Sequence, residues 1–554
     1  MQNRLIYRLA IRILKPLSLY FAYPVYEVLM TQQACIVTNL TLEFSQLKLF
    51  ESLSFQLPLK QFSGLIGRNG QGKSVLMSTL HGQAASELTH SGQISWQCPH
   101  QYLTQLQRVQ AETIAQALDI EDLYLIFQHI QQGCASFTDY EQVENLWHLP
   151  MQWQQLLESA GLPSELSTSI QHLSEGQKTK LALCRLFLLK DHYLLLDEPS
   201  NHLDTQGRQW LINQMAQHTT GGLIISHDRQ LLAHVESIFA LNQFGLNYYG
   251  GNYALYQQQH HSQVEALSQA VQQEKRELKH LKEQQNLSQM KAQKRKKIGE
   301  KLRSSGSQAP ILLDAKKEQA EQSLSHLRKQ QNKQLADAKD ELLHKQTQLE
   351  HLKPQSFEFT PISGKSSVEI LRCHQLKLAF ANTTHLNLAI SAREKLHLKG
   401  INGIGKSTLL KTIHGLIPPA SGEIHCKVSS IYLDQNLSLL DESISAVGYL
   451  CSFDSNLTEQ QARTLLGNLQ IRRDKALTPL ATLSGGERLK VSLLALKQQT
   501  VELLLLDEPE NHLDIESREL LAQAIRSFNG AVILVSHDES FVEECGISED
   551  YVLM

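Results

Sequence analysis

The sequence predicts an α/β protein in which two similar domains are joined by a long antiparallel helical hairpin. Three observations predict this fold class. A Gly-rich motif occurs twice, each time between an apolar strand-like segment and a helical pattern. Three further motifs follow each copy in the same order, which indicates a duplicated module. Between the two modules the composition changes abruptly to Gln, Lys and Glu, with apolar residues at heptad spacing.

Length and composition fit a globular protein of several domains. The chain has 554 residues, of which 42% are hydrophobic and 19% charged, and its net charge is −4. The eight cysteines are scattered without a C-x-x-C pair, so we expect a reduced, cytoplasmic protein. No uninterrupted apolar run reaches the length of about 18 residues that a membrane-spanning helix needs. The sequence therefore excludes a transporter that works without a separate membrane partner.

The first 33 residues form an N-terminal extension with two interpretations. Arg4, Arg8, Arg12 and Lys15 have near-helical spacing among apolar residues, but the apolar core and cleavage site of a signal peptide are missing. The extension is either a basic amphipathic helix for a membrane surface or a dispensable segment after a misassigned start. The first strand-like segment, ACIVTNLTLEF, covers residues 34–44.

The Gly-rich motif follows the P-loop pattern G-x-x-x-x-G-K-[ST], in LIGRNGQGKSVL (65–76) and LKGINGIGKSTL (398–409). Backbone N–H groups of such a loop close around phosphate oxygens at a helix N-terminus. The lysine reaches the β- and γ-phosphates, and the serine is a ligand for Mg²⁺. The predicted binding residues are Gly67, Asn69, Gly70, Gly72, Lys73 and Ser74 in the first copy and Gly400, Asn402, Gly403, Gly405, Lys406 and Ser407 in the second. The sequence thus predicts two sites for ATP with Mg²⁺.

Each module also contains an apolar strand that ends in two adjacent carboxylates, in LLLDEPSNHLD and LLLLDEPENHLD. The first carboxylate, Asp197 or Asp507, is expected to hold the metal through water. The second, Glu198 or Glu508, is placed to accept a proton from the water that attacks the γ-phosphate. The two carboxylates therefore have different predicted roles.

Two shorter motifs complete each module. QHLSEGQKTKLAL (171–183) and ATLSGGERLKVSL (481–493) contain S-x-x-[E/Q], a capping box that opens a helix. A capped helix N-terminus is suited to face a γ-phosphate. The later motifs LIISHD and ILVSHD contain His227 and His537, each suited to contact the same phosphate.

In these motifs, above all DEPSNHLD and DEPENHLD, the chain resembles the ABC-F proteins, soluble ATP-binding-cassette ATPases with two cassettes, several of which act on ribosomes. The resemblance covers the chain from about residue 34 to 554. It implies a head-to-tail sandwich in which two ATP molecules, each between the P-loop of one cassette and the signature motif of the other, close the pair and hydrolysis opens it. Site I would join Lys73, Asp197, Glu198 and His227 to Ser484, Gly485 and Gly486, and site II would join Lys406, Asp507, Glu508 and His537 to Ser174, Glu175 and Gly176. By the same resemblance, Gln105 and Gln435 sense Mg²⁺, and Phe44 and Phe380 are candidates to stack on adenine.

The middle segment predicts two antiparallel helices. Val264, Leu267, Val271, Leu278 and Leu281 mark one apolar seam, and Leu335, Ala338, Leu342, Leu349 and Leu352 mark the other. A helix over residues 264–297 would extend about 50 Å at 1.5 Å per residue. The expected domains are the extension (1–33), a first cassette (34–254), the hairpin (255–355) and a second cassette (366–554).

The hairpin is the basic part of the chain. Residues 264–353 contain 19 Lys/Arg and 12 Asp/Glu, a net charge of +7, so the remaining residues carry −11. The tip residues expected to contact nucleic acid are Lys291, Lys294, Arg295, Lys296, Lys297, Lys301 and Arg303. In ABC-F proteins this linker enters the exit-tRNA site and touches peptidyl-site tRNA and rRNA, so the resemblance implies the ribosome as partner and a monomeric chain whose cassettes pair with each other. The alternative interpretation is a solvated charged spacer.

These features predict an ATP hydrolase that binds the ribosome and uses cassette closure to act on tRNA or the peptidyl-transferase region. Translation factor and antibiotic-resistance protein both fit this description. Two other functions stay open, a peripheral ATP-binding subunit of a membrane exporter and a DNA-associated repair ATPase.

Two features depart from the family pattern. Gln105 and Ser174 are 69 positions apart, whereas Gln435 and Ser484 are 49 apart, so the first cassette carries about 20 extra residues that would form a short arm. Glu175 stands where a small, neutral residue usually lies beside the γ-phosphate of site II. This carboxylate predicts slower turnover at site II, unless its side chain turns to solvent.

Overall fold

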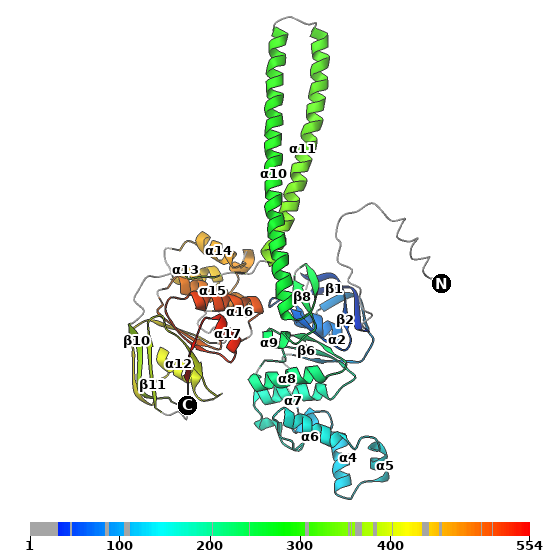
Figure 1. The fold of residues 1–554 in the computed structure, drawn as a ribbon, viewed down its shortest axis with the longest axis vertical. Coiled ribbons are helices and arrows are strands. Elements are labelled where there is room, and N and C mark those ends of the chain that lie inside the picture. The colour runs from blue at the N-terminus through cyan, green and yellow to red at the C-terminus, as the bar shows by residue number, and fades with distance from the viewer. Residues whose placement is uncertain are drawn as a thin grey trace, which may run out of the picture.

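The computed structural model describes residues 32–44, 47–83, 88–104, 111–201, 203–242, 244–304, 310–352, 355, 357–359, 368–379, 385–401, 403–434, 442–453, 457–471, 473–499, 501–511 and 513–553. Two α/β cassettes lie next to each other, and a two-helix hairpin projects from the side where they meet (Figure 1). The predicted fold class is confirmed.

The first cassette contains two sheets. A three-stranded antiparallel sheet has the order β2-β1-β4, with β1 Gln33–Phe44, β2 Leu47–Pro58 and β4 Leu88–Trp96. A six-stranded sheet has the order β5-β6-β7-β3-β8-β9, with β3 Phe62–Ile66, β5 His100–Leu103, β6 Tyr193–Asp197, β7 Gly222–Ile225, β8 Ser237–Asn242 and β9 Gly245–Gly250. Its first five strands are parallel and β9 is antiparallel to β8. Parallel strands place the loops after their carboxyl ends along one edge, where α/β proteins bind ligands.

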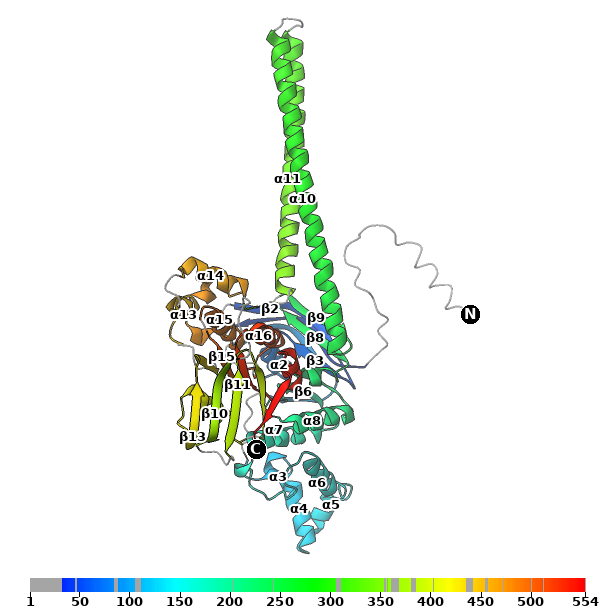
Figure 2. The same ribbon diagram turned by 60° about the vertical axis from the view of Figure 1, so that its left-hand side comes forward.

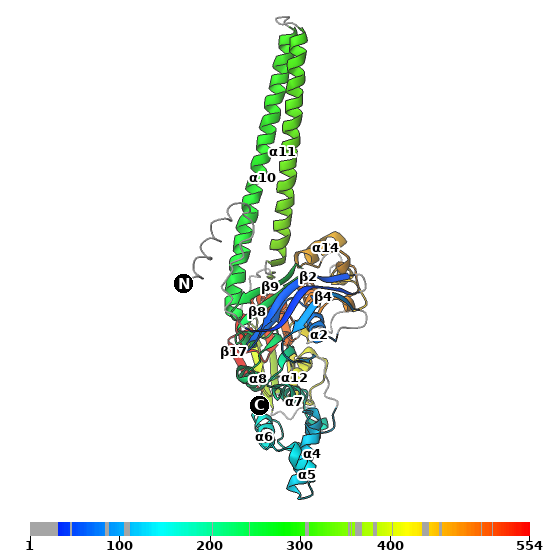
Figure 3. The same cartoon turned by 90° about the vertical axis from the view of Figure 1, so that its right-hand side faces the viewer.

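The helices of the first cassette fall into two groups. Those beside the parallel sheet are α2 Lys73–His81, α7 Glu175–Phe187, α8 Thr205–Gln217 and α9 Arg229–Leu232. A helical subdomain adds α3 Ile114–Ala117, α4 Glu121–Gln131, α5 Phe137–Gln142, α6 Leu149–Ser159 and the 3₁₀ turn Ile170–His172. In Figures 2 and 3, α4 to α6 project from the end of the molecule opposite the hairpin. They belong to the segment of the first cassette in which extra residues were expected to form a short arm.

The second cassette repeats this plan. Its antiparallel sheet has the order β11-β10-β13, with β10 Glu369–Lys377, β11 Leu386–Ser391 and β13 Ser421–Cys426. Its parallel sheet has the order β14-β15-β16-β12-β17, with β12 Lys395–Lys399, β14 Ser430–Leu433, β15 Leu503–Asp507, β16 Ala531–Val535 and β17 Glu549–Val552. The helices are α12 Lys406–His414, α13 Ala446–Phe453, α14 Glu459–Asn468, α15 Gly485–Lys497, α16 Ile515–Ser527 and α17 Glu539–Glu544, with 3₁₀ turns at Arg473–Ala476 and Leu480–Thr482.

The strands that carry the paired carboxylates are the most buried parts of the core. Every residue of β6 and β15 is buried, because helices or the second sheet cover both faces of the parallel sheet. Continuous Leu runs satisfy both faces, whereas an alternating pattern would leave polar side chains inside. The sequence therefore fixes the depth at which Asp197 and Asp507 end their strands.

The hairpin consists of α10 Tyr253–Ser304, of 52 residues, and α11 Pro310–Leu352, of 43 residues. Both are longer than the expected helix of 264–297, and α10 rises about 78 Å at 1.5 Å per residue. The predicted seam residues are partly or fully buried between the helices, Val271 most of all at 4% exposed. Polar contacts also cross the seam, among them Lys345 Nζ to Glu274 Oε1 at 2.7 Å. Nowhere in the described part of the chain is a helix long and apolar enough to cross a membrane.

Candidate active site

The first P-loop connects β3 to α2. Gly72, the N-cap of α2, has a φ of 85°, a conformation that favours glycine, and a Cβ there would lie 2.8 Å from Cζ of Phe50. The buried Lys73 follows, and its Nζ donates hydrogen bonds to the carbonyl oxygens of Gly67 at 2.6 Å and Arg68 at 3.2 Å. The loop thus already surrounds a cation, and phosphate oxygens can take the place of these carbonyls.

The second P-loop has the same construction between β12 and α12. Gly405, the N-cap of α12, has a φ of 110°, and Lys406 Nζ donates to the carbonyl oxygens of Gly400 at 2.8 Å and Ile401 at 3.4 Å. Burial lowers the pKa of Lys73 and of Lys406. A phosphate group would offset this desolvation, because its negative charge stabilises the ammonium form.

Asp197 and Asp507 end β6 and β15 beside the P-loop helices. The hydroxyl of Tyr102 donates to Asp197 Oδ2 at 3.3 Å, and the hydroxyl of Tyr432 donates to Asp507 Oδ2 at 2.9 Å. Ser407 Oγ donates to Asp507 Oδ1 at 3.1 Å, so the two predicted metal ligands of the second cassette already adjoin.

These residues fit Mg²⁺. Among the described residues, Oδ1 of Asp197 is buried and has no hydrogen-bond partner. A buried carboxylate oxygen beside a serine hydroxyl offers the hard oxygen ligands that Mg²⁺ prefers. Burial raises the pKa of Asp197, and a bound cation would oppose that effect.

Glu198 and Glu508 occupy a strained turn after their strands. Their φ values are 50° and 48°, in the left-handed region that non-glycine residues rarely adopt. The backbone N–H of Glu198 donates to the carbonyl of Ile225 at 2.9 Å, and that of Glu508 donates to the carbonyl of Val535 at the same distance. Both copies therefore hold the predicted base in one unusual conformation, which marks a functional position.

A histidine faces each of these glutamates. His227 Nε2 lies 3.3 Å from Glu198 Oε1, and His537 Nε2 lies 3.2 Å from Glu508 Oε1. Burial raises the pKa of Glu198, whereas the hydrogen bond from His537 lowers the pKa of Glu508. The difference follows from enclosure, because the Glu198 side chain is 11% exposed and that of Glu508 is 22% exposed.

The signature helices begin as predicted. Ser174 caps α7 and Ser484 caps α15, and both caps form complete capping boxes with Gln177 and Glu487. Glu175, in the first turn of α7, has a 76% exposed side chain that pairs with Lys178 at 3.0 Å. The carboxylate thus takes the solvent-facing orientation that was one of its two expected states, and slower turnover at site II stays a prediction.

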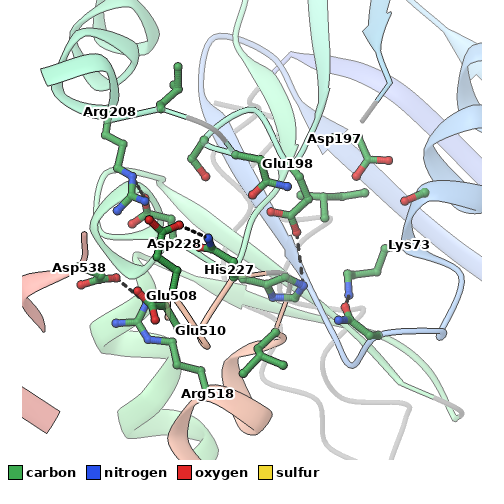
Figure 4. A pocket seen from close by; sticks show the side chains of 18 of the residues that line it. Lys73, Asp197, Glu198, Arg208, His227, Asp228, Glu508, Glu510, Arg518 and Asp538 are labelled. Carbon is green, nitrogen blue, oxygen red and sulfur yellow. Dashed lines mark hydrogen bonds and ion pairs between the residues drawn. The ribbon is translucent and has the colours of Figure 1, made fainter. Parts of the chain in front are cut away.

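A cavity of about 980 Å³ lies between the cassettes (Figure 4). Its lining includes Gly70, Lys73, Ser74, Asp197, Glu198 and His227 of the first cassette, the first signature at Ser174, Glu175 and Gly176, and Glu508 and His537 of the second cassette. Lys406, Ser407, Ser484, Gly485 and Gly486 are not among the described residues that line it. The structure thus brings together the predicted catalytic residues of site I, and it brings the first signature together with part of site II.

The pairing of each P-loop with the opposite signature is therefore incomplete in this arrangement. The cassettes meet at the first P-loop, where the backbone N–H of Asn69 donates to Asp514 Oδ2 at 2.8 Å. Asp514 is the N-cap of α16, and Arg68 Nε pairs with Glu516 Oε2 of the same helix at 2.7 Å. Asp204, at the equivalent place before α8, has a 58% exposed side chain. One edge of the interface is closed, whereas the signature at the other edge borders open space.

Some predicted residues lie outside the described part of the chain. These are Gln105, Gln435, Asn402 and Phe380, together with the side chain of Phe44, whose backbone ends β1. The sequence did not identify Phe50, which packs on the P-loop, or Tyr102 and Tyr432, whose hydroxyls donate to the predicted metal-ligand carboxylates. The repetition of the tyrosine in YLTQ and YLDQ was the available signal, because each closes a strand next to a carboxylate strand.

Comparison with known proteins agrees with this geometry. The family model described as "ABC transporter" matches residues 50–201 and 383–511, together just over half of the chain. The ATP-binding protein YdiF of Bacillus subtilis is 29% identical over 91% of this chain and 78% of its own. ABC transporter F family member 2 of Arabidopsis thaliana is 27% identical over 91% of this chain and 74% of its own. ATP-binding cassette sub-family F member 2 of Mus musculus is 27% identical over 92% of this chain and 78% of its own.

Both matched segments contain a P-loop lysine and a carboxylate pair, and the structure holds each set at the carboxyl edge of a parallel sheet. These parts bind ATP and hydrolyse it. The chain therefore belongs to the ABC transporter family, as a twin-cassette ATPase of its F subfamily.

Proposed function

We propose that this ATPase is a cytoplasmic protein that binds the ribosome and uses ATP-driven closure of its cassettes to act, through the hairpin, on tRNA or the peptidyl-transferase region. The observation that carries the proposal is the hairpin itself. Its helices of 52 and 43 residues form a probe far longer than a connection between two domains requires. Its charge is opposite to that of the rest of the chain.

The tip of the hairpin suits the phosphate backbone of RNA. Lys291, Lys294, Lys297 and Lys301 are exposed near the end of α10. The backbones of Arg295, Lys296 and Arg303 continue the same helix, and their side chains lie outside the described part of the chain. Clustered lysine and arginine bind phosphates with little sequence preference and strong salt dependence. A rigid probe with such an end fits the RNA-walled passages of a ribosome.

We propose the following division of labour in the two ATP sites. Lys73 and Lys406 hold the phosphates, and Ser74, Asp197, Ser407 and Asp507 hold Mg²⁺, which offsets phosphate charge when it is bound. Glu198 and Glu508 each orient a water molecule and accept its proton. His227 and His537 lie beside these glutamates and contact the γ-phosphate. The signature N-terminus of the opposite cassette completes each site when the cassettes close.

The charge and length of the hairpin do not separate a general translation factor from an antibiotic-resistance protein. In both, the tip contacts RNA close to where tRNA is held. The difference lies in where the tip ends, and residues 305–309 at its turn are outside the described part of the chain.

The test is to trap the closed state. Glu198→Gln/Glu508→Gln removes both proposed bases and leaves ATP binding in place, so hydrolysis should fall by about 10²-fold or more. With ATP, this variant should sediment with ribosomes and arrest growth on expression. The matched control is Lys73→Ala/Lys406→Ala, which should not bind ATP and should stay unbound. Recovery of the trapped protein in membranes or on DNA would overturn the proposal in favour of an exporter subunit or a repair ATPase.

A further inference from the structure

A side chain of the second cassette bridges the first P-loop and the hairpin. Arg68 Nη1 donates a hydrogen bond to Gln470 Oε1, and Gln470 Nε2 donates to the carbonyl oxygen of Glu350 at 2.8 Å. Glu350 lies two residues before the end of α11. One amide thus joins the phosphate-binding loop of the first cassette, the second cassette and the returning helix of the hairpin.

The bridging residue is held in an unfavourable backbone conformation. Gln470 follows α14 with a φ of 63°, in the left-handed region. Gly161 follows α6 at the equivalent place in the first cassette, with a φ of 68°. Glycine adopts this conformation without strain, whereas a residue with a side chain is destabilised there by about 1 kcal/mol. A glutamine in a position suited to glycine indicates that its side chain has a use.

A second link leads from the histidine motif to the outgoing helix of the hairpin. Arg229 lies two residues after His227, and its guanidinium pairs with Glu519 of α16 at 2.6 Å and with Glu544 of α17. The guanidinium carbon is also 5.7 Å from the ring centroid of Tyr253, the first residue of α10. One arginine therefore contacts both the second cassette and the root of the hairpin.

The root of α10 packs on an apolar cluster of the first cassette that also receives a residue of the second. The rings of Tyr249, Tyr253 and Tyr256 pack together, with Tyr249 to Tyr256 at 5.0 Å and Tyr253 to Tyr256 at 5.7 Å between centroids. Ile515, the first residue of α16, packs against the apolar cluster that includes these tyrosines. Helix α16 thus contacts the first P-loop through Asp514 and Glu516, and it reaches the hairpin root through Glu519, the partner of Arg229.

These linking residues have no counterparts around the second P-loop. When the two cassettes are aligned through their shared motifs, the position equivalent to each charged or bridging residue holds a residue that cannot make the same contact. The equivalent pairs are Arg68 and Ile401, Arg229 and Glu539, Gln470 and Gly161, Glu516 and Gln206, and Glu519 and Gln209. An ion pair between α8 and the second cassette at these positions is therefore impossible. Both cassettes therefore contain the catalytic motifs, whereas the residues that link an ATP site to the hairpin occur only around the first P-loop among the compared positions.

We propose that ATP at site I, and not ATP at site II, controls the base of the hairpin, and that Arg68, Gln470 and Arg229 are the positioning residues that transmit its state. Phosphate bound by the first P-loop changes the surroundings of Arg68, and γ-phosphate bound at His227 changes those of Arg229. Each change acts on one of the two hairpin helices. Site II can still hydrolyse ATP, but no equivalent chain of described contacts leads from it to the hairpin.

The inference rests on the ATPase and not on the proposed ribosome function, because the links lie within one chain. It is tested on the purified full-length protein without ribosomes. Amide hydrogen exchange is followed at residues 253–263 and 345–352, the two roots of the hairpin. In the Glu198→Gln/Glu508→Gln background, added Lys406→Ala leaves ATP bound at site I alone, and added Lys73→Ala leaves it at site II alone.

ATP should slow exchange at both roots by about tenfold when only site I is loaded, and should leave it unchanged when only site II is loaded. Gln470→Gly should abolish the effect at residues 345–352, although it relieves backbone strain and should not destabilise the fold. Arg229→Gln should abolish the effect at residues 253–263. The matched control is Glu539→Gln at the equivalent place in the second cassette, which should change neither root.

Equal slowing from either site would show that the hairpin responds to closure as a whole, and the proposal would be wrong. An unchanged ATP effect in the Gln470→Gly/Arg229→Gln double variant would also overturn it, because another route would then carry the signal. Binding of ATP, measured separately in each variant, distinguishes a lost link from a lost nucleotide.

Discussion

At the scale of single residues, the predicted catalytic glutamates combine a strained backbone conformation with a chemical role. Glu198 and Glu508 keep a left-handed backbone at a cost of about 1 kcal/mol or more each. A hydrogen bond from each N–H group to the neighbouring strand stabilises that conformation. The residue two places later differs between the copies, with Ser200 in the first cassette and Glu510 in the second.

Glu510 provides a prediction about pH. Burial raises the pKa of Glu510 to about 7, and its carboxyl accepts a hydrogen bond from Ser536. A carboxyl whose pKa is raised on folding stabilises the native state fully below its ordinary pKa of about 4.5, and this stabilisation is lost as the pH rises through about 7. Glu510→Gln should therefore stabilise the second cassette relative to the original chain at pH 8, by at most about 3 kcal/mol.

The measurement for Glu510 is the difference in unfolding midpoint between the two proteins from pH 5 to pH 8. The difference should grow with pH across this window. The control is Ser200→Ala, since Ser200 has no charge to titrate and any change should be independent of pH. A constant difference for Glu510→Gln would show that the carboxyl is ionised in the folded protein throughout.

At the scale of elements, local sequence predicts what local contacts determine. The signature helices start at Ser174 and Ser484 because each cap is satisfied within four residues, and the motif contains both partners. The buried carboxylate strands follow equally from their Leu runs. The first turns of α10, before the predicted helix of 264–297, follow no heptad pattern, because tyrosines take the place of Leu and Val there and pack on the apolar cluster of the first cassette.

Contacts between distant parts of the chain were also beyond the sequence. Arg68 and Gln470 are 402 positions apart; Arg68 occupies a variable position of the P-loop motif, and Gln470 lies outside the motifs. The use of Gln470 became visible only through its positive φ and its equivalence with Gly161. The candidate catalytic set could be assembled from the sequence because its motifs occur twice in the same order, whereas the asymmetric links occur once.

The hairpin provides the element-scale prediction. Replacement of Lys294, Arg295, Lys296 and Lys297 by Ala keeps a strong helix former at each position and removes four charges at the tip. Affinity for ribosomes should fall, and the slope of its logarithm against the logarithm of salt should decrease by about 3 if each charge meets one phosphate. ATPase activity without ribosomes should change little, because the tip is far from both ATP sites (Figure 1).

A matched control separates position from charge. Lys275, Arg276, Lys279 and Lys282 lie on the same helix nearer its root, and their replacement by Ala removes the same number of charges. This variant should retain most of the salt-dependent affinity. Equal losses in both variants would indicate a diffuse electrostatic attraction, and no loss in either would leave the hairpin as a spacer.

At the scale of the whole molecule, the interface between the two cassettes has one edge in contact and one edge that borders a cavity. Asp514, Glu516 and Glu519 of the second cassette contact the first cassette around site I. The first signature and Glu508 instead border the cavity of about 980 Å³. The proposed closure of the second edge would therefore be a rotation about the first, and Arg229, which contacts Tyr253 at the root of α10, lies at the edge that is already in contact.

This geometry predicts a nucleotide-dependent movement at site II. Probes at Gln171, before the first signature, and at the exposed Ile401 of the second P-loop should report it. A cysteine is introduced at each position in the Glu198→Gln/Glu508→Gln background. The accessible native cysteines are first replaced by Ser, namely the exposed Cys134 and Cys426 and the half-buried Cys98 and Cys451. ATP should shorten the spin-label distance between them, because the phosphate at the second P-loop attracts the N-terminus of α7. Lys406→Ala removes the phosphate contact and should prevent the shortening, while Lys73→Ala should reduce it less.

A distance that ATP leaves unchanged, with ATP binding verified at site II, would show that the two edges do not close in this order and that the open edge has another purpose.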